Sequence, residues 1–298
     1  MLKYFFSKAT LVFVSAALTC GAAYYSFAKP GNFFLPKSKP EPQHRKLDLK
    51  VSSVCQFNGA LCQGFGNWEE ADLNCRHKFF NFPDLKPGDY GEVTIDLTVT
   101  GGDACGEMTI KDILDRGNKC VEPETKTRID RDCRGKNPGS KEKNGEMRES
   151  IEFQIWLDQG RILGFQGKTD PGEGDNIYNE KDALMMDWTS LRKCPKTFEL
   201  RKFLRTNRQK YWNDCQNADG DGDGKKCKKN VCHGVARDGR LIEGVTYYIG
   251  FAWRLPETVG NEAQTDSLKF DLRFTAKGSE SCQPCQNTCH HCEDRCRD

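Results

Sequence analysis

Hydrophobic and polar residues alternate in several short stretches of the chain, and this alternation is typical of β-strands with one buried face. The stretch at residues 93–99 puts four apolar side chains on one face and polar ones on the other, namely Val93, Ile95, Leu97 and Val99 against Thr94, Asp96 and Thr98. The same alternation recurs at residues 47–51, 151–157, 245–253 and 268–274. Segments of this kind line the inner surfaces of an antiparallel β-sandwich, so the pattern predicts an all-β fold.

Few segments have the 3.6-residue period of an amphipathic helix. Residues 69–80 could form a helix, and residues 180–193 place Leu184, Met185, Trp188 and Leu191 near helical spacing. We interpret the second segment as a lid packed on one end of the sandwich rather than a ligand site. A parallel α/β fold needs a helix between each pair of strands, so the pattern disfavours it.

Two long connections separate the predicted strands. Residues 117–149 and 205–240 are charged and rich in glycine, and they contain Cys120, Cys133, Cys215, Cys227 and Cys232. Long loops in a compact domain are usually functional or held by covalent constraints. We therefore expect disulfides to tie these loops down.

The cysteine content changes the expected compartment. The chain has 298 residues, 16 cysteines and a mean hydropathy of −0.73. So many thiols in a polar chain favour an oxidising, extracellular location. The apolar stretch at residues 10–23 follows a lysine-containing start and is short for a membrane span, which predicts a signal peptide at residues 1–28. A retained membrane anchor or lipidation at Cys20 is the alternative.

Removal of this segment leaves equal numbers of basic and acidic residues and an odd number of cysteines. A balanced surface argues against nucleic acid or an anionic membrane as the main partner. The odd number means that at least one thiol is free, bound to metal or paired between chains. Residues 29–45 follow with four prolines and many charges, as in an extended linker.

Several sequence blocks resemble the TasA/camelysin family, in particular its archaeal branch with signal peptides of the SipW-processed type. In chain order they are "FFNFPDLKPGDYGEVTIDLTV" (residues 79–99), "CVEPE" (120–124), "IEFQIWLDQG" (151–160), "GDNIYNE" (174–180) and "YIGFAWRLPETVGNEAQTDSLKFDLRF" (248–274). The last block is the most specific. The signal region ends in "AAYYSFAKP" rather than the small-aromatic-Phe-Ser-Asp sequence of the family.

The resemblance implies a secreted subunit with a jelly-roll-like sandwich that polymerises into extracellular filaments, pili or biofilm matrix fibres. The partners would be further copies of the chain in a head-to-tail homopolymer, together with other matrix or cell-surface components. In such filaments an extended N-terminal segment completes a sheet of the neighbouring subunit. Here that donor would be residues 29–45, with Phe33, Phe34 and Leu35 as apolar plugs, although its prolines cannot donate ladder hydrogen bonds.

The predicted organisation is therefore a signal peptide at 1–28, a donor segment at 29–45, a sandwich at 46–276 with an insertion at 205–240, and a cysteine-rich tail at 277–298.

The insertion contains a candidate calcium loop. Asp219, Asp221, Asp223 and Gly224 occupy positions 1, 3, 5 and 6 of an EF-hand-type loop. Position 12 is Asn230 instead of glutamate, so the expected affinity is weak. The alternative is a solvated acidic turn balanced by neighbouring lysines. We expect a structural calcium clip here, because no two-state element that a switch would need is visible.

A second acidic loop at residues 169–182 offers oxygen ligands at irregular spacing, namely Asp170, Asp175, Asn176, Asn179 and Asp182, and we expect calcium at the last four. A network of Asx turns is the alternative.

The tail contains cysteines at intervals of three and four residues, namely Cys282, Cys285, Cys289, Cys292 and Cys296. Zinc is one reading of this spacing, but disulfides suit an exported chain better.

No catalytic pattern stands out. The chain lacks an HExxH motif and a Gly-x-Ser-x-Gly elbow, and its five histidines are scattered or lie in the tail. We expect no enzyme, and the metalloprotease activity that the name camelysin implies is the least favoured reading. The leading function is a polymerising structural subunit stabilised by disulfides and calcium, and the alternative is a monomeric calcium-binding surface adhesin.

Overall fold

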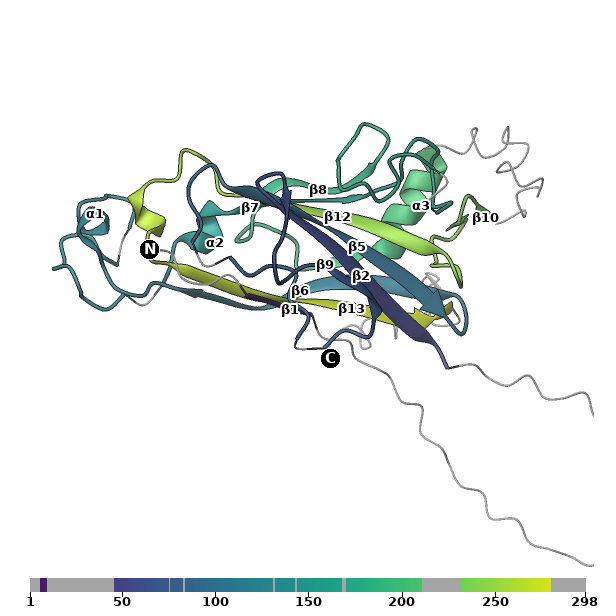
Figure 1. Cartoon of the computed structure of the whole chain (residues 1–298), viewed down its shortest axis with the longest axis horizontal. Coiled ribbons are helices and arrows are strands. Elements are labelled where there is room, and N and C mark those ends of the chain that lie inside the picture. Colours follow the sequence, from purple (N-terminus) through teal and green to yellow (C-terminus); the bar gives the residue numbers. More distant parts are fainter. Residues whose placement is uncertain are drawn as a thin grey trace, which may run out of the picture.

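The computed structural model describes residues 6–9, 46–74, 76–82, 84–130, 132–142, 144–167, 170–210 and 231–279. Within these residues the chain is mostly β-strand, with antiparallel sheets and a few short helices, which confirms the all-β prediction. Figure 1 shows two elongated layers of strands, with most helices and loops at the two ends.

The larger layer is a seven-stranded sheet with the order β3-β2-β5-β12-β7-β8, in which β4 also pairs with β2. Its strands are β2 (Asp48–Phe57), β3 (Ala60–Leu61), β4 (Trp68–Ala71), β5 (Tyr90–Thr100), β7 (Glu152–Leu157), β8 (Ala183–Ser190) and β12 (Thr246–Arg254). All of its pairings are antiparallel. Four of these strands contain segments that the alternation predicts.

The smaller layer has four strands in the order β1-β13-β6-β9. They are β1 (Phe6–Ala9), β6 (Ala104–Arg116), β9 (Thr197–Glu199) and β13 (Ser267–Gly278). β13 contains the predicted strand at 268–274, but β6, the longest strand in the described chain, is not among the predicted ones. β1 pairs in parallel with β13, so a strand from the predicted signal peptide lies on the outer edge of this sheet.

The two layers pack face to face around an aromatic and aliphatic core. Phe270 of β13 contacts Phe153 of β7 with ring centroids 5.6 Å apart, and Phe274 lies 6.2 Å from Phe79. The predicted inner faces of β5 and β13 are fully buried, as the alternation requires; they are Val93, Ile95, Leu97 and Val99, and Leu268, Phe270, Leu272 and Phe274.

Two predicted helices are wrong. Residues 69–80 begin in the strand β4 and continue as loop, and residues 180–193 contain the strand β8 at the edge of the large sheet. In β8 the pairing with β7 slips at two places, so its apolar residues do not follow a period of two. Met185 and Met186 are adjacent and both buried, and this irregular pattern of buried residues resembles the spacing of an amphipathic helix.

The helices lie in the connections. They are α1 (Glu122–Thr125), α2 (Met147–Ser150), α3 (Leu200–Lys210) and the 3₁₀ turn η1 (Asn261–Ala263). The predicted insertion at 205–240 is thus in part regular, since α3 enters it and the short hairpin of β10 (Val231–Cys232) and β11 (Val235–Ala236) closes it.

The first long connection is closed by a disulfide as expected, whereas Cys215 and Cys227 of the second lie outside the described residues. Cys120 is bonded to Cys133 within the first long connection, and Cys55 is bonded to Cys62. Cys105 and Cys232 are also disulfide-bonded. Among the described cysteines Cys194 is free, and it is buried. None of the helices in the described part of the chain has the length and apolar content that a membrane-spanning helix needs.

Candidate functional site

The predicted calcium residues of the second acidic loop lie in the connection between β7 and β8. Asp182 is 5% exposed, and both of its carboxylate oxygens accept hydrogen bonds from backbone amides. Oδ1 accepts from Gln159 N at 2.9 Å, and Oδ2 accepts from Asn179 N at 2.8 Å. This carboxylate anchors the loop at both of its ends.

Asp175 and Asn179 form local turns. Asp175 Oδ1 accepts from Ile177 N at 2.9 Å, and Asn179 Oδ1 accepts from Lys181 N at 3.0 Å. Both contacts span two residues, as in Asx turns. For these two residues the structure agrees with the alternative reading of the sequence, in which the loop is a turn network.

Asn176 differs from its neighbours. It has a φ of 67°, it is 2% exposed, and neither atom of its side-chain amide has a hydrogen-bond partner. Its backbone N–H donates to Asp158 Oδ2 at 3.0 Å. Buried polar atoms without partners are uncommon in folded proteins, so this position marks the polar centre of the loop.

Asp158 is the residue of this centre that sequence reasoning missed. It follows directly after β7, it is fully buried, and its Oδ1 has no hydrogen-bond partner. Burial raises the pKa of its carboxyl group to about 8, with a further contribution from the negative charge of Asp182. The feature of the sequence that could have identified Asp158 is an acidic residue directly after an apolar strand.

The loop therefore brings Asp158, Asn176 and Asp182 together, but most of its oxygens are engaged by backbone amides. Calcium at Asp175, Asn176, Asn179 and Asp182 stays a prediction, and Asp158 Oδ1 and Asn176 Oδ1 are buried oxygens without a hydrogen-bond partner.

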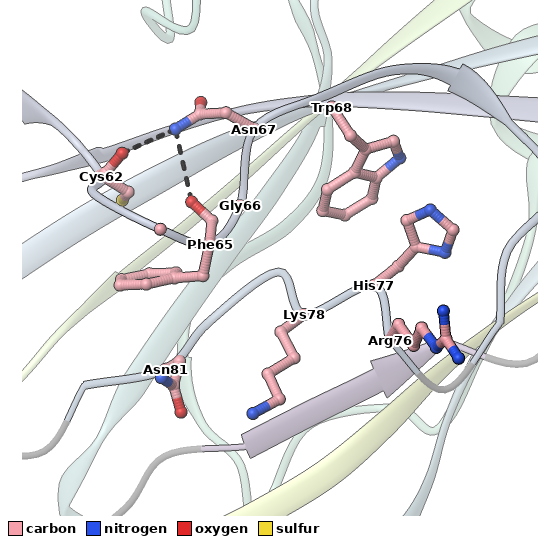
Figure 2. A pocket seen from close by; sticks show the side chains of 10 residues that line it. Cys62, Phe65, Gly66, Asn67, Trp68, Arg76, His77, Lys78 and Asn81 are labelled. Carbon is pink, nitrogen blue, oxygen red and sulfur yellow. Dashed lines mark hydrogen bonds between the residues drawn. The ribbon is translucent and has the colours of Figure 1, made fainter.

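A surface pocket lies beside the Cys55–Cys62 disulfide and combines aromatic and basic side chains (Figure 2). Asn67 Nδ2 donates to the carbonyl oxygens of Cys62 and Phe65 at 2.8 and 3.3 Å, which fixes one wall. On the other side the rings of Trp68 and His77 lie 5.1 Å apart between centroids. The lining suits an acidic or aromatic group of a partner, and it contains no arrangement for covalent catalysis.

The outer edge of β13 is the second candidate site. Among the described strands, only β1 pairs there, with Phe6 to Ala9 alongside Lys269 to Leu272. Further along, at residues 273–277, no described strand pairs with the outer side of β13. The backbone of an edge strand is a template for adding another strand.

Three groups of predicted residues lie outside the described residues. They are the apolar plugs Phe33, Phe34 and Leu35, the calcium loop with Asp219, Asp221 and Asp223, and the tail cysteines at 282, 285, 289, 292 and 296.

No protein-family model matches the chain, and no curated protein matches it. The resemblance to the TasA/camelysin family therefore stays a hypothesis based on the sequence blocks quoted above.

Proposed function

We propose that the protein is an extracellular structural subunit that polymerises by adding an extended N-terminal segment of one copy to the β13 edge of the next. The single observation that supports this proposal most is the β13 edge itself. It is long, it carries an N-terminal strand in parallel pairing over four residues, and beyond Leu272 no described strand covers it.

The edge strands β3, β8 and β9 are poorer templates. β3 and β9 have two and three residues, and β8 pairs with its neighbour in a slipped register. Short or irregular edges resist strand addition, whereas a long one supports it. A contact between the N-terminal segment of one copy and the β13 edge of another is heterologous, so it propagates without closing.

The extracellular location and the jelly-roll strand order are parts of the same proposal. The disulfides at Cys55–Cys62 and Cys120–Cys133 support the location, since such bonds persist in oxidising compartments. Apolar residues of the donor would anchor it by pocket insertion where its prolines interrupt the backbone ladder.

Electron microscopy of the purified protein starting at residue 29, next to a form starting at residue 46, tests the proposal. The longer form should assemble into filaments and the shorter form should remain monomeric. Within the longer form, Phe34→Asp should abolish assembly, whereas Lys37→Asp in the same segment should leave it intact.

Monomers of the longer form, with or without calcium, would contradict polymerisation. In that case glycan or cell binding by the monomer would support the calcium-binding adhesin instead. Filaments formed equally well by both forms would show that residues 29–45 are not the donor.

A further inference from the structure

The loop between β6 and β7 encloses a buried cluster of carboxylates that the sequence did not single out. Glu124 lies on α1, Asp130 and Glu142 lie in the loop, and Glu146 comes directly before α2; we refer to these four as the acidic cluster. Glu124 and Asp130 are fully buried and Glu142 is 7% exposed. In Figure 1, α1 lies at the left end of the molecule and α2 lies on the same side but nearer the sheets.

Most carboxylate oxygens of the acidic cluster lack a partner. Neither oxygen of Glu142 accepts a hydrogen bond from an N–H or hydroxyl donor, although its side chain is buried, and its carboxyl group lies against that of Glu146. Glu124 uses one oxygen to accept from Val121 N at 2.7 Å, and Asp130 uses one to accept from Cys133 N at 2.7 Å. The other oxygen of each is buried without a partner, as is Glu146 Oε2.

The backbone around the acidic cluster is built to hold these side chains close together. The Cys120–Cys133 disulfide closes the loop, and Cys120 exchanges backbone hydrogen bonds with Gly139 and Ser140. A Cβ atom at Gly117 would lie 2.0 Å from Glu142 Cγ, so only glycine leaves room for this carboxylate. The fold of the loop therefore holds these carboxylates together, unlike acidic groups that meet by chance on an exposed surface.

A fifth carboxyl group, that of Asp266, lies against the cluster. Asp266 is fully buried, its Oδ2 accepts from Glu146 N at 2.5 Å, and its Oδ1 has no partner. No ion pair joins Glu124, Asp130, Glu142 or Glu146 to a basic side chain within the described residues. Burial and the mutual repulsion of these carboxylates raise the pKa of Glu142 to about 7 and that of Glu146 to about 8. Above these pH values the packed carboxylates are ionised, and a bound cation would compensate their charge.

The distances match one ion shared by several carboxylates. One oxygen each of Asp130, Glu142 and Glu146 can be chosen so that all lie within 4.8 Å of one another. Ca²⁺ binds oxygens at about 2.4 Å, so two of its ligands can lie at most about 4.8 Å apart. Glu124 and Glu142 satisfy the same limit. Cys133, which lies beside them, is in a disulfide and offers no thiolate, which disfavours zinc.

We propose that Glu124, Asp130, Glu142 and Glu146 bind a structural calcium ion that locks the β6–β7 loop onto the end of the sandwich. This site is separate from the acidic loops that the sequence indicated, and it does not depend on polymerisation.

The test is thermal unfolding of the purified protein at pH 8 in EDTA and in calcium chloride, for wild type and Glu142→Gln. Calcium at about a hundred times its dissociation constant should raise the wild-type melting temperature on the order of 5 °C. Glu142→Gln removes a repelling charge, so in EDTA the variant should melt above wild type. In calcium the order should reverse, because the variant has lost a central ligand.

Glu122→Gln is the matched control, because Glu122 is on the same helix α1 but is exposed and paired with Lys126. It should behave as wild type in both solutions. Equilibrium dialysis with calcium should show one ion fewer bound to Glu142→Gln than to wild type or to the control.

An equal number of bound ions in wild type and Glu142→Gln would overturn the proposal. So would a variant that melts below wild type by the same amount in EDTA and in calcium, because that result describes a structural side chain only. A wild-type melting temperature that does not respond to calcium would also overturn the proposal. That outcome is expected if Arg131 or Lys143, which flank the cluster in sequence, already neutralises its charge.

Discussion

At the scale of residues, two glycines face tryptophans across neighbouring strands of the large sheet. Gly250 is paired with Trp156 and Gly91 is paired with Trp253, and both indoles are buried. A Cβ atom at Gly250 would lie 2.0 Å from Trp156 Cε2, and one at Gly91 would lie 2.7 Å from Trp253 Nε1. Each indole occupies the space that a side chain on the next strand would fill.

Gly250→Ala should therefore destabilise the protein by about 1–3 kcal/mol, because the added methyl group overpacks a buried contact. Urea denaturation followed by tryptophan fluorescence measures the change. Gly278→Ala is the control, since a Cβ atom there meets nothing within 4 Å, and it should leave the midpoint unchanged. Equal midpoints for the two variants would contradict this account of the Gly–Trp pairs.

At the scale of elements, the β6–β7 connection combines a disulfide and polar contacts of its own with contacts to η1, β13 and β8. Its helices α1 and α2 have four residues each, too short to be stable alone. The Cys120–Cys133 disulfide, with a sequence separation of 13, restricts the loop that carries Asp130. The disulfide and the calcium ion proposed for the acidic cluster would thus stabilise the same element.

Replacing Cys120 and Cys133 together with serine should lower the free energy of unfolding by about 3 kcal/mol, the usual effect for a loop of this length. The loss should be larger in calcium than in EDTA, because the loosened loop holds the ion less tightly. The double serine variant of Cys55 and Cys62 is the control, and its loss should not depend on calcium. Chemical denaturation of wild type and both double variants, in calcium and in EDTA, gives the loss in free energy of unfolding for each variant in each solution.

At the scale of the whole molecule, carboxyl groups with raised pKa values are spread over three connections between strands. Burial raises the pKa of Asp158 to about 8 and that of Asp266 to about 9, in addition to the raised values of Glu142 and Glu146. The folded protein therefore binds more protons than the unfolded chain between the ordinary carboxyl pKa and about pH 8. In that window the free energy of unfolding falls as the pH rises.

We accordingly expect the protein in EDTA to be most stable near pH 5 and to lose stability steadily toward pH 8. Calcium should reduce this loss, since a bound cation favours the ionised carboxylates. Urea denaturation at several pH values, with EDTA or calcium, measures both effects. Stability that rises from pH 5 to pH 8 in EDTA would contradict the assignment of protonated carboxyl groups.

The strands whose side chains alternate without a break between the core and the outer face could be predicted from the sequence. In β5 and β13 the alternation of side chains follows directly from the pleat, and the buried residues are the expected ones. The irregular elements could not be predicted. In β8 the apolar residues do not alternate, because the pairing with β7 slips. β6 was missed because its second half is polar and more exposed, although alternate residues from Ala104 to Ile110 are buried.

The sequence by itself determined the β-rich class, the inner faces of the main strands and the expectation of disulfides, because these depend on residue type and on spacing within one strand. Only the tertiary structure decided which acidic residues meet. Glu124, Asp130, Glu142 and Glu146 have no metal-binding spacing along the chain, and the disulfide, Gly117 and the turn into β7 bring them together. Contacts between distant residues depend on how the loop folds over the sandwich, and local patterns do not contain that information.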